Sequence, residues 1–191
     1  MSKNQFSLPS IVGLVVYSND TVVQRARQKT KPKPKPKRGE IMEFSDNARK
    51  RLAFVASNTE VEFQSMITLT YPAEFPCDGK IVKRHLYKFL YWLKELMPGV
   101  NYLWFLEFQR RGAPHLHILL DRQPAHYGGT WPSFQFSVAN TWYEIVASRD
   151  HKHLLAGTRS ERLRTPEGGK HYCVKYAQKM AQKEVPDSFW N

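Results

Sequence analysis

Two apolar segments separated by a very short connection constrain the fold of this chain most strongly. Residues 102–109 and 115–121 each have the length and composition of a strand, and only Arg110-Arg-Gly-Ala-Pro114 lies between them. A connection this short joins antiparallel neighbours, because parallel neighbours need a crossover of a dozen or more residues. The sequence therefore predicts a β-hairpin and, around it, an antiparallel sheet.

Helices are predicted on both sides of this hairpin. Residues 63–71 have strand character, and apolar residues recur at helical spacing over residues 78–97 until Pro98-Gly99 ends the pattern. Further helices are predicted over 134–148, over 170–183 and after a Ser45 cap, the last with an apolar stripe of Ala48, Leu52 and Val55. The polar segment between 148 and 170 is left unassigned. This order of elements predicts an α+β fold with a central antiparallel sheet and packed helices.

The first 39 residues differ in composition from the remainder. Residues 11–17 and 21–27 flank a Ser-Asn-Asp turn, which predicts a hairpin within an N-terminal extension over 1–28. Alternating lysine and proline over residues 29–39 favours an extended basic linker or arm. Since a chain of 191 residues is short for two ordinary domains, residues 40–191 are predicted to form one.

The charge of the chain favours a polyanionic partner, either nucleic acid or an anionic membrane surface. The net charge is +12, but six of these positive charges lie within residues 29–38, where a solubilising linker explains them equally well. No apolar run approaches the roughly 20 residues of a membrane span, so no membrane association is expected. Two cysteines without a CxxC pair fit a reducing cytoplasm.

The second strand of the central hairpin carries a pair of histidines. Because side chains alternate between the faces of a strand, His115 and His117 are predicted to share one face, opposite Leu116 and Ile118. The hairpin would bring Glu107 beside them. Two imidazoles and a carboxylate suit Mg²⁺ or Mn²⁺. The alternatives are two polar residues on a half-exposed strand and a surface carboxylate that balances Arg110 or Arg111.

The last predicted helix carries two tyrosines on a cationic face. Tyr172, Lys175, Tyr176 and Lys179 fall within one arc of the helix, while an apolar stripe occupies another face. A tyrosine hydroxyl can attack phosphorus and hold a covalent phosphodiester, and a nearby ammonium can stabilise the developing charge. The alternative is an ordinary solvated face of an amphipathic helix.

Three motifs, in this order, resemble those of the HUH endonuclease superfamily, and specifically of the Rep proteins that initiate rolling-circle replication in single-stranded DNA phages and plasmids. They are Ile67-Thr-Leu-Thr-Tyr-Pro72, Gly112-Ala-Pro-His-Leu-His-Ile118 with Glu107 upstream, and Tyr172-x-x-Lys175-Tyr176-x-x-Lys179. The resemblance implies an RRM-like palm, Mg²⁺ or Mn²⁺ bound by Glu107 and both histidines, and attack by a tyrosine that leaves a 5′-phosphotyrosine. Tyr172 is preferred for the first cut. The tyrosine pair resembles the two-tyrosine Reps, although a single active tyrosine is compatible with the same motif.

Other residues and partners follow less directly. Thr68 and Thr70 share a strand face and are candidates either for contacting DNA, together with Arg110 and Arg111, or for supporting the site, while β-propensity explains them equally well. Three tryptophans are candidates for base stacking or for the core: Trp104, Trp131 and Trp142.

The expected partners are single-stranded DNA or an origin hairpin, with a host helicase and polymerase, because no GxxxxGK[ST] phosphate loop is present. The expected location is the cytoplasm of a bacterial host cell. Two other functions remain open: a single-tyrosine insertion-sequence transposase, and a non-catalytic single-stranded DNA-binding module.

Overall fold

Four strands form one antiparallel sheet in the computed structural model of the chain, which describes residues 11–16, 21–25 and 46–178. In spatial order they are β4 (Tyr102–Phe108), β5 (Pro114–Leu120), β3 (Ser65–Thr70) and β6 (Thr158–Arg162). β4 and β5 are the predicted hairpin, and Gly112 in their turn has a φ of 77°, a conformation that favours glycine. The predicted α+β class is confirmed.

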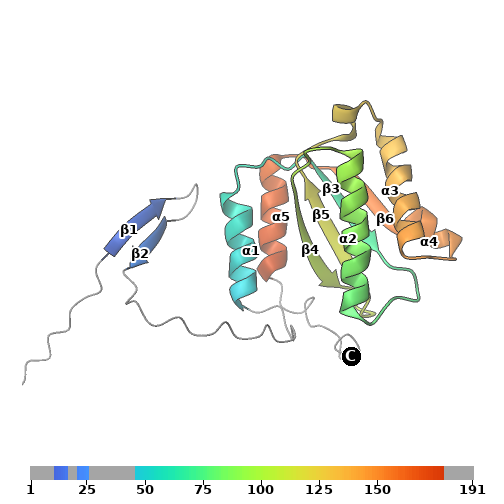
Figure 1. The fold of residues 1–191 in the computed structure, drawn as a ribbon, viewed down its shortest axis with the longest axis horizontal. Coiled ribbons are helices and arrows are strands. Elements are labelled where there is room, and N and C mark those ends of the chain that lie inside the picture. The colour runs from blue at the N-terminus through green and yellow to red at the C-terminus, as the bar shows by residue number, and fades with distance from the viewer. Residues whose placement is uncertain (1–10, 17–20, 26–45, 179–191) are drawn as a thin grey trace, which may run out of the picture.

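Helices cover both faces of this sheet (Figure 1). One face packs against α2 (Gly79–Leu96) and α3 (Trp131–Ile145), and the other packs against α1 (Asp46–Asn58) and α5 (Pro166–Gln178). The 3₁₀-helix η1 (Pro124–Tyr127) and the short α4 (His151–Ala156) lie in connections. From β3 to β6 the main elements follow a β-α-β-β-α-β pattern with both crossover helices on one face, as in RRM-like folds.

Two apolar clusters fill the space between the sheet and its helices. The larger joins alternate residues of β3 and β5, among them Ile67, Leu116 and Ile118, to α2 and α3. The smaller joins Met66, Phe105 and Leu119 to α1 and α5. Alternation along each strand therefore sends neighbouring residues to different clusters, and the histidines of β5 share the α1 and α5 side.

Helix α2 follows its prediction closely. Asp78 caps its first turn by accepting a hydrogen bond from the Lys80 backbone N at 2.7 Å. The predicted apolar stripe faces the larger cluster, with Leu90 partly buried and the others buried: Val82, Leu86, Phe89, Leu93 and Met97. The 3.6-residue period in the sequence thus identifies the inner face of this helix correctly.

The other predicted elements differ in detail. α3 begins at Trp131 because Thr130 and Ser133 form a capping box ahead of position 134. In α1 the predicted stripe is wrong at Val55, which is 44% exposed, because the helix turns Ala56 toward the smaller cluster instead. The unassigned segment contains both α4 and β6. The Ser45 cap and residues 179–183 of the last predicted helix lie outside the described residues.

The N-terminal hairpin prediction is confirmed for the residues that the structure describes. β1 (Ile11–Val16) and β2 (Thr21–Arg25) pair antiparallel as a two-stranded sheet of their own. The Ser-Asn-Asp turn and the Lys-Pro segment over 29–39 lie outside the described residues. Among the described helices, none has the length and apolar character needed to cross a membrane.

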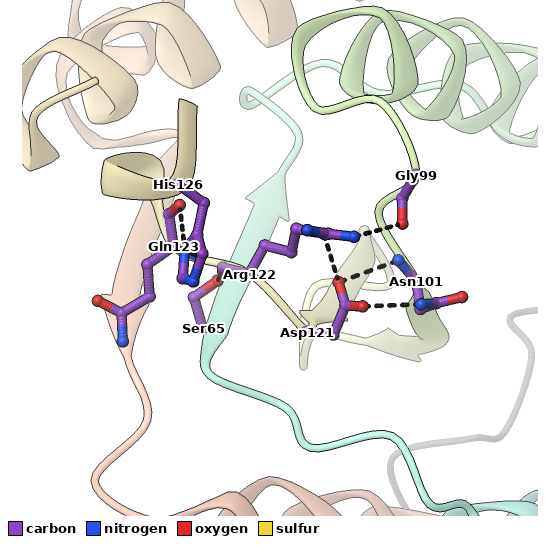
Figure 2. Close-up of polar contacts among 7 residues, drawn as sticks. All are labelled: Ser65, Gly99, Asn101, Asp121, Arg122, Gln123 and His126. Carbon is purple, nitrogen blue, oxygen red and sulfur yellow. Dashed lines mark hydrogen bonds and ion pairs between the residues drawn. The ribbon is translucent and has the colours of Figure 1, made fainter. Parts of the chain in front are cut away.

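A polar network closes one end of the sheet (Figure 2). The Ser65 hydroxyl, at the start of β3, donates to the Arg122 carbonyl oxygen at 2.6 Å. The Asp121 carboxylate accepts from the Asn101 backbone N at 3.0 Å and from its side-chain amide at 2.7 Å. The Arg122 guanidinium donates to the Gly99 carbonyl oxygen at 3.2 Å. These bonds tie the exit of β5 to the entry of β4 and to β3.

Candidate functional site

The opposite end of the sheet presents the histidine pair. His115 and His117 lie on the face of β5 that α1 and α5 cover, with ring centroids 4.6 Å apart at an interplanar angle of 81°. His117 is only 3% exposed, and His115 is partly buried. The predicted sharing of one strand face is therefore confirmed, and the pair lies inside the protein rather than on an open surface.

Two threonines of β3 hold these imidazoles. Thr68 pairs with His117 and Thr70 with His115 in the strand register, and each threonine Oγ1 lies 3.1 Å from the Nδ1 of its histidine. A hydrogen bond at Nδ1 orients an imidazole ring and leaves Nε2 for another partner, as in histidines that bind metals. The contacts fit the supporting role considered for these threonines, and contact with DNA stays a prediction.

The backbone of Thr70 is itself fixed by two buried side chains. Its carbonyl oxygen lies 2.8 Å from the indole Nε1 of Trp142 and 2.8 Å from Nε2 of His153. Its N donates to the Gly157 carbonyl oxygen at 2.8 Å. The sequence analysis did not identify His153, and it considered Trp142 for base stacking; a fully buried Trp142 belongs to the core. Both residues position the strand that orients His115.

The other two tryptophans occupy different surroundings. Trp131 is partly buried against the larger cluster, and the Arg162 guanidinium lies 5.2 Å from its ring centroid. Trp104, on the edge strand β4, is 39% exposed. Of the three, only Trp104 keeps the exposure that base stacking requires.

Glu107 completes the cluster. It lies directly opposite His115 in the β4–β5 register, and its Oε2 is 3.4 Å from Nε2 of His117. The side chain is buried, and its Oε1 has no hydrogen-bond partner among the described residues. A buried carboxylate oxygen without a partner is costly, so this position favours a cation.

The donor set fits a divalent cation, although its present geometry is not that of a formed centre. Two imidazole nitrogens and one carboxylate are suitable ligands for Mn²⁺ or Mg²⁺, and three protein ligands leave positions for substrate oxygens. Within residues 46–178 no three His, Cys, Asp or Glu side chains already form a group that could hold a metal ion. Binding would therefore require small side-chain movements around Glu107.

Burial sets the protonation of His115. Desolvation first, and then the neighbouring His117 and Arg111, lower the pKa of His115 to about 4. The imidazole is therefore neutral near neutral pH, which is the form that binds metals.

Helix α5 brings Tyr172 to this cluster. The centroid of its ring lies 5.7 Å from that of His117 and 6.0 Å from that of Phe105, and Phe105 stacks on His117 at 4.9 Å. Tyr172 is partly buried against the smaller cluster, so the expectation of a solvated cationic face needs correction for this residue. The helix turns so that Cys173 and Tyr172 both face the sheet.

The rest of the tyrosine motif is less fully described. Lys175 is exposed on α5. Tyr176 lies within the helix, but its side chain is outside the described residues, as is Lys179 altogether. Their predicted roles stay predictions.

The two arginines of the β4–β5 turn differ. Arg110 is exposed. The Arg111 guanidinium donates to the carbonyl oxygens of Tyr71, Pro72 and Ala73 at 2.6, 2.7 and 3.3 Å, and it lies 5.1 Å from the Phe75 ring centroid. Arg111 therefore fixes the loop that follows β3, a role that its sequence position did not indicate, and DNA contact by either arginine stays a prediction.

Comparison with known proteins assigns a family. Searches of curated proteins and of solved structures gave no match. The family model of the replication-associated protein ORF2 matches residues 64–181. This range is more than half of the 191 residues and includes β3, the histidine strand and the tyrosine helix. The chain therefore belongs to the replication-associated protein ORF2 family.

Proposed function

We propose that this chain is an HUH-type initiator of rolling-circle replication, which cuts and rejoins single-stranded DNA through a 5′-phosphotyrosine. The observation that carries the proposal is the placement of Tyr172 beside His117, within the cluster that also contains His115 and Glu107. A potential nucleophile and a potential cation site thus meet on one face of the sheet. Membership of a replication-associated family supports a DNA substrate.

Cleavage would proceed by transesterification. The Tyr172 hydroxyl loses its proton, and its oxygen bonds to the scissile phosphorus while the bond from phosphorus to the 3′ oxygen breaks. The departing oxygen takes up a proton and becomes a free 3′-hydroxyl that can prime synthesis. Joining reverses these steps: a 3′-hydroxyl attacks the phosphotyrosine, and the tyrosine leaves. One phosphate ester bond forms for each one broken, so no external energy source is needed.

The roles of neighbouring side chains follow from their positions. Glu107, His115 and His117 would hold Mg²⁺ or Mn²⁺, which supplies positive charge to a phosphate oxygen when bound. Lys175, three residues after Tyr172, would stabilise charge on the phosphate, and Tyr176 with Lys179 would supply a second nucleophile one turn further along. Since the sequence contains no GxxxxGK[ST] phosphate loop, strand opening is assigned to a host helicase and extension to a host polymerase.

A covalent-adduct assay tests the proposal. Purified protein is incubated with single strands tiled from the DNA element that encodes it, with Mn²⁺ or with EDTA, and products are resolved on denaturing gels. We expect a Mn²⁺-dependent adduct that mass spectrometry maps to Tyr172. Tyr172→Phe should abolish the first adduct, while Tyr143→Phe, which also removes the hydroxyl of a partly buried tyrosine, should leave it intact.

The same assay separates the alternatives. Retained DNA binding with no adduct under any metal condition would reject the enzyme in favour of the binding module. If Tyr176→Phe leaves repeated cutting and joining unchanged, one tyrosine suffices, as in a single-tyrosine transposase. Selective cutting next to hairpins at the ends of a mobile element would then support that second function.

A further inference from the structure

The outer face of α2 carries a concentration of positive charge that the candidate site does not use. Five basic residues of this helix are exposed, against one exposed acid, Glu95, which gives a net +4 (5 − 1): Lys80, Lys83, Arg84, Lys88 and Lys94. The inner face is buried in the larger cluster. Packing of the helix therefore accounts for its apolar side and leaves the charged side unexplained.

Two exposed tyrosines lie among these cations. Tyr87 is 70% exposed and Tyr91 is 59% exposed, one turn apart on the same helical face, between Arg84 and Lys94 in the sequence. Aromatic side chains are usually at least partly buried, since exposure forgoes much of the stabilisation that burial of the ring provides. Two of them side by side within a basic stripe indicate a surface that stacks planar groups.

This stripe lies on the far side of the sheet from the candidate site. α2 packs on the face of Ile67, Leu116 and Ile118, whereas His117 and Tyr172 lie on the face of α1 and α5 (Figure 1). At the edge of the sheet, Lys94 Nζ lies 5.4 Å from the ring centroid of Tyr102 on β4, and strand alternation places the exposed Trp104 on that same face. The surface is therefore separate from the site and extends onto β4.

We propose that the outer face of α2 binds single-stranded DNA, with Tyr87 and Tyr91 stacking on unpaired bases and the flanking lysines contacting phosphates. This inference rests on the proposed function for its choice of ligand. Unpaired strands combine the two required features, since their phosphates match the net positive charge and their bases are free to stack. In a duplex the bases already stack on each other, so the exposed tyrosines would have no role. A strand held here would remain on the protein while its cut end is held at the other face.

The test measures equilibrium binding in EDTA, so that no cleavage is required. Fluorescein-labelled single strands of about 30 nucleotides, long enough for several site sizes of roughly 4 to 16 nucleotides, are compared with a duplex of equal length by anisotropy. Tyr87→Ala/Tyr91→Ala is paired with Phe136→Ala, which removes a 68% exposed aromatic from α3. Lys83→Ala/Lys88→Ala is paired with Arg149→Ala/Lys152→Ala, which removes two exposed charges elsewhere. Alanine favours helix, so α2 should stay folded, and circular dichroism checks this.

We expect the tyrosine double variant to bind single strands at least about tenfold more weakly, while duplex binding changes less than about twofold. The lysine double variant should weaken both and lower the slope of log affinity against log salt by about 1.4 for the single strand, about 0.7 per cation. Both control variants should bind as the wild type does. Unchanged single-strand affinity in the tyrosine variant would overturn the proposal, as would loss of binding to anionic vesicles instead of DNA.

The outcome is separable from that of the adduct assay. If no adduct forms but the tyrosine variant loses single-strand affinity, the nicking function fails and the α2 surface stands. If Tyr172 forms the adduct and the tyrosine variant binds normally, the nicking function stands and the α2 surface fails.

Discussion

The two ends of the sheet use polar side chains in opposite ways. At the end where β3 starts, Ser65, Asp121 and Arg122 bond to backbone atoms and to one another (Figure 2). At the end where β3 stops, Glu107 and the two histidines gather within a few ångströms, and Glu107 keeps a buried oxygen without a partner among the described residues. The first arrangement satisfies its polar groups internally, as structural networks do. The second leaves capacity for a ligand, which is typical of functional sites.

The largest expected effect is at Glu107. Glu107→Gln keeps the shape of the side chain but removes its charge, so we expect adduct formation to fall by at least about 100-fold, since loss of an outer-shell partner alone typically costs roughly 10- to 100-fold. Stability should hold or increase, because a buried carboxylate is no longer desolvated. Adduct rates and urea midpoints measure the two properties. A variant that loses stability and keeps activity would remove the distinction between the ends.

The second prediction concerns the threonines that orient the histidines. Thr70→Val preserves shape and β-propensity but removes the hydroxyl that bonds to Nδ1 of His115. We expect about 10- to 100-fold weaker activation by Mn²⁺ in a metal titration of adduct formation, with the maximal rate less affected. Thr68→Val tests His117 in the same way. An unchanged Mn²⁺ titration in both variants would show that these bonds do not orient ligands.

The third prediction concerns pH. The folded pKa of His115, about 4, lies below its ordinary value of 6.5, so between these values the unfolded chain binds more protons. The resulting stability is complete above the ordinary pKa of 6.5 and is lost as the pH falls toward 4. After allowance for partial solvent access, this loss should be about 2 kcal/mol in EDTA. Urea unfolding at several pH values measures it, and His115→Gln should flatten that part of the profile. An equally steep profile in the variant would assign the loss to other groups.

How far the sequence predicts this molecule differs between its parts. α2 and the β4–β5 hairpin were predictable because periodicity and a short connection are local signals. β6 was not, because a five-residue edge strand with Arg159, Glu161 and Arg162 carries little apolar alternation. The hydrogen bonds that fix Thr70 join residues 72 and 83 positions apart, and no local pattern announces them. The burial of Tyr172 likewise depends on how α5 rotates against the sheet.

The candidate site shows the same division. The sharing of one face by His115 and His117 follows from strand alternation, and the proximity of Glu107 follows from the hairpin register. Which threonine bonds to which histidine depends on the β3–β5 register, which no short connection sets. The three motifs were therefore readable, whereas the contacts between motifs required the fold.

The smallest expected effect tests the closed end of the sheet. Ser65 is 1% exposed and its hydroxyl donates one hydrogen bond, so Ser65→Ala removes a buried bond and leaves the Arg122 carbonyl oxygen to find another partner. A loss of about 1 kcal/mol in unfolding free energy is expected. Adduct formation should stay unchanged because Ser65 lies at the opposite end of β3 from Thr70, whose partners include the site histidine. The urea midpoint should shift while the denaturant slope stays constant. If activity falls along with stability, the two ends are coupled through β3, and the histidine site depends on the closed network as well as on its own threonines.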